Sequence, residues 1–405
     1  MIRKVRIMNF KALKDLTIEF TPLTVLIGEN SSGKSTVLQA LDFLCSITSR
    51  DIDEYLKDRE WDFGEIKSQF SLPEESIYFE SVIEIDGTSL CWKISINNDD
   101  GKWTIKERIN DKQSKECYLS YNQGQKDFPF DFSQLSIKSS ALKMLDIDKS
   151  PSKDGKCNPV IFKLKAWLSS SNSFELLTPD RMRSRGSRGK PDDIGMGGEK
   201  LAAFIHGMLP HKKSELNKLV SDFIGYDVKI ATTTKGQQGW VEMYLIETWG
   251  TMEVKIKKRY ISDGLLRIIA LTSVIANHDG RKSGHFSSGA GSGNMKGFIM
   301  LDEIEDGISP SHSEMLIRRF KTMVSDLKRQ VVITSHSPVM INFIDEDSIQ
   351  FLWRDKAGTI HAEPLFKTDK MRETLDILNP GEVWLNYTRE EIIEKLSGSQ
   401  EEVNA

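Results

Sequence analysis

The segment LTVLIGENSSGKSTVLQALDFL, residues 23–44, decides the fold of this chain. It begins with a short β-rich apolar run, residues 23–27, which suits a buried strand. From Lys34 onward the apolar residues recur at helical spacing, and small hydroxyl residues occupy the first turn. Between the two lies a full G-x-x-x-x-G-K-[ST] motif, in the strand–loop–helix context that makes it specific for phosphate binding. The segment therefore predicts a P-loop within an α/β domain.

Each residue type in the loop has a chemical role. The glycines let the backbone curl so that its N–H groups face phosphate oxygens. Lys34 would neutralise β and γ oxygens, and the Ser35 hydroxyl would bind Mg²⁺. ATP and Mg²⁺ are therefore the expected cofactors, whereas a plain Gly/Ser turn before a helix would need neither. The expected nucleotide-binding residues of the loop are Gly28, Glu29, Asn30, Ser31, Ser32, Gly33, Lys34, Ser35 and Thr36.

A second apolar strand, residues 297–301, ends in Asp302 and Glu303. A strand that is buried on both faces has this composition. Taken alone, an acidic end of this kind is more often a strand that enters solvent. Downstream of a P-loop, however, the two acids suit ATP hydrolysis. Asp302 would hold Mg²⁺ through water, and Glu303 would orient and activate the attacking water.

Two shorter signals follow the same logic. An apolar run, residues 331–333, leads to His336, which could sense the γ-phosphate through a hydrogen bond, although a lone histidine at a strand end is usually structural. Ser262, Asp263 and Gly264 precede an apolar helical run, and alone they indicate an ordinary helix N-cap. Neither signal is specific for nucleotide binding by itself. Both support it because they follow a P-loop in the sequence.

Composition limits the possible functions. The chain has 405 residues with 55 Lys+Arg against 59 Asp+Glu, a formal charge of −4, which excludes a wholly basic nucleic-acid coat but leaves room for local basic patches. No apolar run approaches the roughly 18–20 residues of a bilayer span, and the first residues do not resemble a secretion signal. The four cysteines form no CxxC pair, so we expect neither a disulfide framework nor a zinc site. A cytoplasmic location is expected, with no membrane partner.

The remaining sequence predicts a β layer and an insertion. Residues 77–85 and 90–96 alternate in polarity on either side of Asp86-Gly87, a strong hairpin signal. Residues 133–173 are rich in Ser and Lys and predict an insertion with exposed loops, and residues 280–296 predict a flexible Gly/Ser surface loop. Further expected elements are a helix near residues 199–205 and strands at 227–231, 240–247 and 252–257.

In this order the four motifs resemble those of the ABC-type ATPase heads of the RecF, SMC and OLD (overcoming lysogenisation defect) group. The Ser-Asp-Gly-x-x-Arg form of residues 262–267 is similar to the RecF/OLD side of that group. The resemblance extends from residue 1 to about 355. It also rests on the stretches at residues 5–13, 178–181, 198–202 and 302–310.

The resemblance implies an α/β fold: a P-loop ABC-type ATPase head with an antiparallel β layer and an inserted, largely helical lobe. It also implies a homodimer or higher homo-oligomer through ATP-sandwiched heads, in which Ser262, Asp263 and Gly264 of one subunit cover the ATP of the other. The expected divisions are an N-terminal ATPase half, the inserted region, a C-terminal ATPase half and a tail, at residues 1–130, 131–225, 226–355 and 356–405.

No Toprim nuclease domain and no long coiled coil is evident in the sequence. The chain therefore resembles the stand-alone ATPase subunits of anti-phage defence systems such as Septu and PARIS. This resemblance implies a sensor or regulatory scaffold that controls a separate effector, a nuclease being the favoured kind. The alternative is a DNA-binding repair ATPase that resembles RecF and has no toxic partner. A nuclease with an unrecognised metal site in the tail or the insertion is a third, weakly supported possibility.

Two regions bear on these alternatives. Basic clusters at residues 181–190 and 255–259 could contact nucleic-acid phosphates, or they could be solvated charged loops. Within the first cluster, Arg181 is the better candidate because it is expected at a strand end. Trp384 in the tail could contact an effector, and an equally good interpretation is that it closes the ATPase core.

Overall fold

The structure is a computed structural model. It describes residues 1–99, 101–122, 137–145, 158–175, 178–183, 191, 193–235, 240–276, 297–327 and 329–397. The loop expected at 280–296 lies outside these residues, as does most of the basic cluster that begins at Arg181.

A six-stranded sheet forms the centre of the molecule, in the order β15-β14-β3-β13-β12-β8. All neighbours in it are parallel except β15, which pairs antiparallel with β14 at one edge. Side chains alternate between two cores, so that Val25 faces one and Leu26 the other. Burial on both faces explains why these strands are continuous apolar runs in the sequence. The strands are β3 (Leu23–Ile27), β8 (Asn172–Phe174), β12 (Ile299–Leu301), β13 (Val331–Thr334), β14 (Ile349–Arg354) and β15 (Ile360–Pro364).

An antiparallel β layer packs on one side of this centre, together with two helices that share its core. Its strand order is β2-β1-β4-β5-β6-β7. The hairpin expected at Asp86-Gly87 is confirmed: it joins β4 to β5, and both turn residues have positive φ, 48° and 82°. The elements are β1 (Ile2–Phe10), β2 (Leu13–Glu19), β4 (Ile77–Ile85), β5 (Thr88–Asp99), β6 (Lys102–Asp111), β7 (Cys117–Asn122), α1 (Lys34–Ser46) and α4 (Pro159–Ser169). Two short helices, α2 (Ile52–Asp58) and α3 (Phe63–Ile66), connect α1 to the layer.

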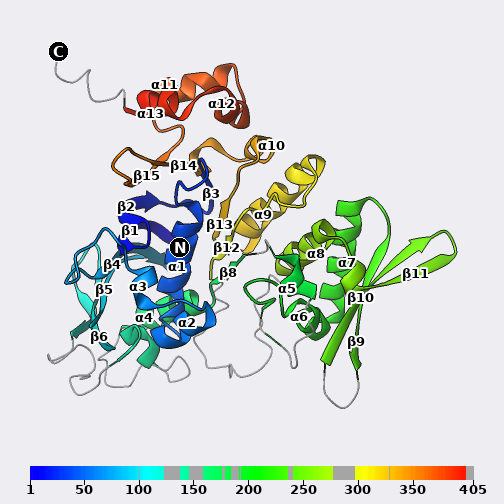
Figure 1. Cartoon of the computed structure of the whole chain (residues 1–405), viewed down its shortest axis with the longest axis horizontal. Helices are drawn as coiled ribbons and strands as arrows, with labels where there is room; N and C mark the ends of the chain where they lie inside the picture. The colour runs from blue at the N-terminus through cyan, green and yellow to red at the C-terminus, as the bar shows by residue number, and fades with distance from the viewer. Residues whose placement is uncertain are drawn as a thin grey trace.

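The other face of the central sheet is covered by α9 (Ser313–Leu327) and α10 (Pro338–Ile341), and beyond α9 lies a lobe (Figure 1). Its described residues form four α-helices and a three-stranded antiparallel sheet in the order β11-β10-β9. Its core is continuous with that of the central sheet. The lobe elements are α5 (Pro179–Arg183), α6 (Leu201–Gly207), α7 (Pro210–Ile224), β9 (Val228–Lys235), β10 (Trp240–Trp249), β11 (Met252–Lys257) and α8 (Asp263–Ala276).

The C-terminal helices α11 (Asp369–Arg372), α12 (Pro380–Asn386) and α13 (Arg389–Ser397) lie at the top of the molecule in Figure 1. Trp384 on α12 packs edge-on against Phe351 of the central sheet, with ring centroids 5.8 Å apart. The Gly381 N–H donates to Asn342 Oδ1 at 2.7 Å. Of the two interpretations of Trp384, the packed position favours closure of the ATPase core.

The fold class expected from the sequence is therefore confirmed, with local differences. Within the expected insertion, α4 joins the core of the β layer and β8 becomes an edge of the central sheet. Arg181 lies in helix α5 and not at a strand end. Among the described residues no helix has the length and apolar character needed to cross a membrane.

Candidate nucleotide-binding site

The loop between β3 and α1 has a backbone that only glycine can adopt at two points. Gly28 has φ 154° and Gly33 has φ 97°. A Cβ atom on Gly28 would lie 2.2 Å from the Leu352 carbonyl oxygen, and one on Gly33 would lie 2.6 Å from Cδ1 of Ile360. The neighbouring strands β14 and β15 thus press against the loop, so both glycines are needed for positive φ and for close approach.

Lys34 is the first residue of α1, and only 5% of it is exposed. Its Nζ donates to the carbonyl oxygens of Gly28 at 3.0 Å and Glu29 at 2.9 Å, so the side chain folds back over the loop. Burial lowers the pKa of Lys34, while nearby carboxylates, Asp302 first among them, oppose that change. The lysine and the acidic strand end therefore share one electrostatic environment, as a phosphate-binding cation and a metal-binding acid would require.

Asp302 and Glu303 follow β12, beside the end of β13. The Thr334 hydroxyl, at the end of β13, donates to Asp302 Oδ1 at 2.6 Å and accepts from the Glu303 backbone N–H at 2.8 Å. Glu303 has a positive φ of 45°, an unusual conformation for a residue with a side chain. Thr334 therefore fixes both acids at once, a role that the sequence did not suggest.

Glu303 and His336 influence each other's charge. Burial raises the pKa of the Glu303 carboxyl, with Asp302 and Asp306 adding to the rise and His336 opposing it. Burial also lowers the pKa of His336, as does the nearby Lys34 ammonium. The half-buried imidazole is therefore neutral near pH 7, in which form one ring nitrogen donates and the other accepts a hydrogen bond.

Glu305 is a further acid in this group, and reasoning from the sequence did not assign it a role. The backbone N–H of His336 donates to Glu305 Oε1, and burial raises the pKa of Glu305. Its other oxygen, Oε2, is buried and has no hydrogen-bond partner among the described residues. The carboxylate thus ties the 303–308 turn to the loop that carries His336. The position of Glu305, two residues after Glu303, is the feature of the sequence that could have indicated this role.

Ser262, Asp263 and Gly264 stand at the start of α8 in the lobe. Ser262 Oγ accepts from the Leu265 N–H at 3.4 Å, as an N-cap does. Arg183 on α5 forms an ion pair with Asp263 and donates to the Ile261 carbonyl at 2.8 Å. Figure 1 shows α8 on the far side of α9 from α1.

The P-loop is also contacted by the C-terminal tail. Arg389 at the start of α13 pairs with Glu29 at 3.1 Å. The two residues border a cavity of about 280 Å³, whose other walls are P-loop residues 30–32 and residues 354–356 at the end of β14. A cavity lined by charged and polar residues therefore lies directly beside the first half of the loop.

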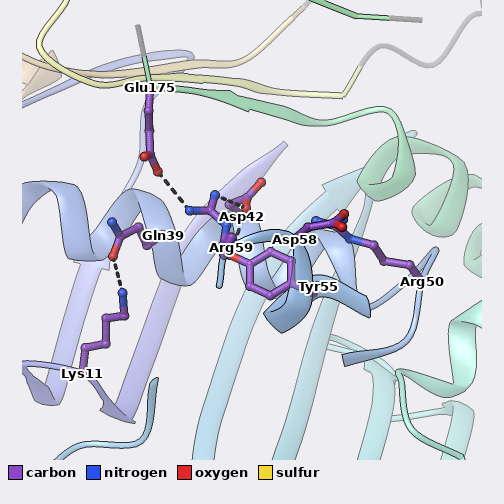
Figure 2. Close-up of polar contacts among 8 residues, drawn as sticks. All are labelled: Lys11, Gln39, Asp42, Arg50, Tyr55, Asp58, Arg59 and Glu175. Atoms are coloured by element: carbon purple, nitrogen blue, oxygen red, sulfur yellow. Dashed lines mark hydrogen bonds and ion pairs between the residues drawn. The ribbon is translucent and has the colours of Figure 1, made fainter. Parts of the chain in front are cut away.

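Behind the loop, α1 is held by polar contacts of the buried Arg59 side chain, which Figure 2 shows. Only 4% of the Arg59 side chain is exposed, and its guanidinium pairs with Asp42 of α1 at 2.7 Å and with Glu175 at 3.0 Å. The Tyr55 hydroxyl donates to the same Asp42 carboxylate at 3.0 Å. Because Glu175 directly follows β8, the network joins the P-loop helix to the chain segment that leads into the lobe.

The residues present suit Mg²⁺. This ion prefers oxygen ligands and usually keeps several waters alongside one or two protein groups and substrate phosphates. Ser35 in the first turn of α1 supplies a hydroxyl, and the buried Asp302 supplies a carboxylate. No group of three or more His, Cys, Asp or Glu side chains suited to a metal occurs in the described part of the chain, so the residues do not indicate an all-protein metal cage.

Comparison with known proteins agrees with this geometry. The family model described as "AAA ATPase domain" matches residues 1–173, which include the whole P-loop. An OLD nuclease from Thermus scotoductus (strain ATCC 700910 / SA-01) is 36% identical over 44 residues, which are 11% of this chain and 8% of that protein. This match therefore spans only a small part of the relative's length.

Two solved structures are also similar. The SMC head domain from Thermotoga maritima is 14% identical, covers 90% of this chain and 98% of its own, and has a TM-score of 0.43. The recombination mediator protein RecF of the RecFOR pathway is 13% identical, covers 89% of this chain and 98% of its own, with the same TM-score of 0.43. The site geometry, the motif order and the family match support an ATP-binding P-loop ATPase.

Proposed function

We propose that this protein is an Mg²⁺-dependent ATPase that acts as a sensor or regulatory scaffold for a separate effector in anti-phage defence. The observation that carries the ATPase part is the convergence of Lys34, the Asp302–Glu303 pair and His336 at one end of the central sheet. The effector part rests on the resemblance to stand-alone ATPase subunits, which implies a nuclease as the favoured partner.

The proposed reaction is hydrolysis of the β–γ phosphoanhydride. The backbone N–H groups of the P-loop and the Lys34 ammonium bind the phosphate oxygens and stabilise the charge on them. Mg²⁺, when bound, would neutralise further charge on the same oxygens. Glu303 accepts a proton as water attacks the γ-phosphorus; the bond to the bridging oxygen breaks, and ADP and phosphate leave. His336 would hydrogen-bond the γ-phosphate and so report whether it is present.

Hydrolysis in this proposal requires two subunits. The start of α8, with the exposed Ser262 and Asp263, offers N–H groups and a hydroxyl to an anion, as helix N-termini do. Helix α8 lies on the far side of α9 from the P-loop helix α1, and the resemblance to ABC-type heads implies that these groups serve the ATP of a second subunit. The ATP-bound head dimer would then be the state that an effector recognises.

The first experiment is the variant Glu303→Gln. Loss of the carboxylate should slow hydrolysis by orders of magnitude while ATP binding is kept, and it should trap an ATP-bound dimer. Steady-state phosphate release and binding of a fluorescent ATP analogue measure the two effects. Glu314→Gln, in an exposed ion pair on α9, is the matched control. Normal hydrolysis by Glu303→Gln would show that Glu303 is not the general base.

A second experiment tests the effector. Native mass spectrometry of the assembly purified from its own operon, with and without ATP, should show a stoichiometric second polypeptide. The DNA-binding alternative instead requires bound DNA, salt-sensitive affinity and DNA-stimulated hydrolysis. No described contact favours that alternative: Arg183, from the basic cluster, is engaged with Asp263 and the Ile261 carbonyl.

A further inference from the structure

The outer edge of strand β11 is open. This strand follows β10 through a turn at Gly250 and Thr251, and within the described part of the chain no strand pairs with its other edge. Five of its six residues are exposed and Ile256 is half-buried. Figure 1 shows β11 as the outermost strand of the lobe. An open edge that also carries exposed apolar side chains is a template for pairing with another strand.

The hydrogen bonds of the neighbouring strand β10 show which residues of β11 direct their backbone N–H and C=O groups to the open edge. The Thr248 N–H donates to the Asp227 carbonyl at 3.3 Å, on the β9 side of β10. Thr248 and the residue opposite it, Glu253, therefore form a non-hydrogen-bonded pair of the β10–β11 ladder. Since this direction alternates along a strand, Glu253 and Lys255 present their backbone N–H and C=O groups to the open edge.

The side chains of β11 are segregated by face. Met252 and Val254 lie on the same face as Trp249, and they are 60%, 36% and 51% exposed. The opposite face carries Glu253 and Lys255, with the Lys255 ammonium 4.0 Å from the centre of the Tyr244 ring. The open edge thus has an apolar side and a side on which charges of opposite sign alternate.

We propose that two copies of this chain pair edge to edge through β11, antiparallel about a two-fold axis at Val254. In this register Glu253 of each copy lies opposite Lys255 of the other, at positions where both backbones exchange hydrogen bonds. Val254 meets Val254, and Met252 meets Ile256, at the closer non-hydrogen-bonded positions. The strand is therefore complementary to itself in backbone, charge and apolar contact.

The neighbouring registers are less favourable. An axis at Glu253 places the two Glu253 carboxylates opposite each other, and an axis at Lys255 does the same for two ammonium groups. Like charges directly opposite each other in an antiparallel pair are destabilising. If one copy were shifted by a single residue, residues whose backbone N–H and C=O groups face the open edge would lie opposite residues whose groups face β10, and the two strands could not exchange hydrogen bonds. The charge order of the strand thus selects one register.

The resulting interface goes beyond the proposed function. It would join two lobes into one continuous six-stranded sheet, in the order β9-β10-β11-β11-β10-β9, without any nucleotide. It uses a different surface from the start of α8, where ATP-dependent head contact is proposed. The two contacts together would allow assemblies larger than a dimer.

The charge pattern gives the first test. Light scattering of the full chain without nucleotide should give a dimer mass at tens of micromolar. Glu253→Lys and Lys255→Glu should each raise the dimer dissociation constant about tenfold or more, because both symmetry-related pairs become repulsive. The double variant E253K/K255E restores complementarity and should restore the dimer. A monomeric wild type, or a double variant as weak as the single ones, overturns the proposal.

Cysteine cross-linking tests the register. In Val254→Cys the two Cα atoms would be about 4.5 Å apart, within reach of a disulfide. Thr251→Cys is the matched control, because its two copies would be offset by six residues, about 20 Å. Mild oxidation should cross-link the first variant and not the second or the wild type; equal cross-linking, or none, overturns the register. Binding of a fluorescent ATP analogue, measured in every variant, separates this outcome from failure of the ATPase proposal.

Discussion

Gly264, the second residue of α8, lies directly against Gly307, in the turn that follows Asp302 and Glu303. A Cβ atom on Gly264 would be 2.7 Å from the Gly307 carbonyl oxygen, and one on Gly307 would be 2.8 Å from the Gly264 Cα. Beside them Arg267 pairs with Asp306 at 3.2 Å. The segment proposed to cover the ATP of a second subunit is therefore in contact with the acidic turn of its own chain.

This contact predicts that Gly264→Ala slows hydrolysis while the P-loop still binds ATP. The added methyl group must displace the 303–308 turn, and with it Glu303. Because small displacements of a catalytic group are costly, we expect at least about a tenfold fall in kcat. Phosphate release and nucleotide affinity, measured side by side, test this.

Gly64→Ala is the matched control, since a Cβ atom there would meet nothing within 4 Å. It should leave both measurements unchanged. If the Gly264→Ala protein has the wild-type kcat, the 303–308 turn accommodates the methyl group without displacing Glu303, and the prediction is wrong.

Lys34→Ala should weaken ATP binding. The variant loses a charged donor to the phosphates, worth about 1.5–3 kcal/mol or roughly 10–150-fold in affinity. It also loses the bonds from Nζ to the Gly28 and Glu29 carbonyls, so the loop itself becomes less ordered. Isothermal titration with ATP and Mg²⁺ measures the effect, with the exposed Lys57→Ala as control. Equal affinity in both variants would contradict the assignment of Lys34.

Arg59→Leu should destabilise the fold far more than Arg50→Leu, although both guanidinium groups lie over the Tyr55 ring. Removal of Arg59 leaves the Asp42 and Glu175 carboxylates without their cation, and breaking a buried pair costs about 3–5 kcal/mol. Glu175 is 31% exposed, so we expect a value near the lower end.

The control removes an exposed ion pair, Arg50–Asp58, which is worth less than about 1 kcal/mol (Figure 2). Urea unfolding followed by circular dichroism gives the free energy of unfolding of each variant. Similar losses in both would mean that the Arg59 network is not a main support of α1.

The fall in kcat on the acid side of the pH–rate profile should reflect protonation of the Glu303 carboxylate. A general base must be deprotonated, and the pKa of Glu303 is raised from the usual 4.5, so kcat should fall with decreasing pH at a higher pH than an ordinary glutamate would give. The pKa of His336 is lowered from 6.5, so this residue should stay neutral from pH 8 to 7.

Asp306→Asn tests this assignment, because the Asp306 carboxylate is one cause of the raised pKa of Glu303. Its removal should move the acid limb of kcat to lower pH. Profiles of both proteins between pH 5 and 9 suffice for the comparison. A limb that stays in place, or moves to higher pH, would assign the titration to another group.

Much of the fold was predictable because its signals are local. The strand, glycine loop and helix of residues 23–44 lie within one short segment, and the Asp86-Gly87 hairpin needs only its own turn chemistry. Strand β8 could not be predicted in the same way. Its three residues have no periodicity of their own, and they form a strand only because β12 offers them a parallel edge.

The candidate site likewise contains residues that the sequence indicates and residues that only the structure reveals. The motif residues of the candidate site could be named from the sequence because their chemistry restricts residue type. Thr334 and Arg59 could not, since a threonine or an arginine at these positions has no local signature, and Arg183 could be named only as part of the basic cluster at residues 181–190. Each acquires its role from partners 17 to 116 residues away along the chain, such as Asp42, Asp302, Asp263 and Glu175.

The sequence by itself determined the P-loop and the order of the acidic and histidine-bearing strands, because backbone conformation and phosphate chemistry restrict the residue at each of those positions. Only the tertiary structure decided that Gly264 meets Gly307, that Arg59 joins α1 to the segment after β8, and that the outer edge of β11 has no partner strand among the described residues. These relationships depend on which surfaces pack together, and packing is settled by shape and burial over the whole chain.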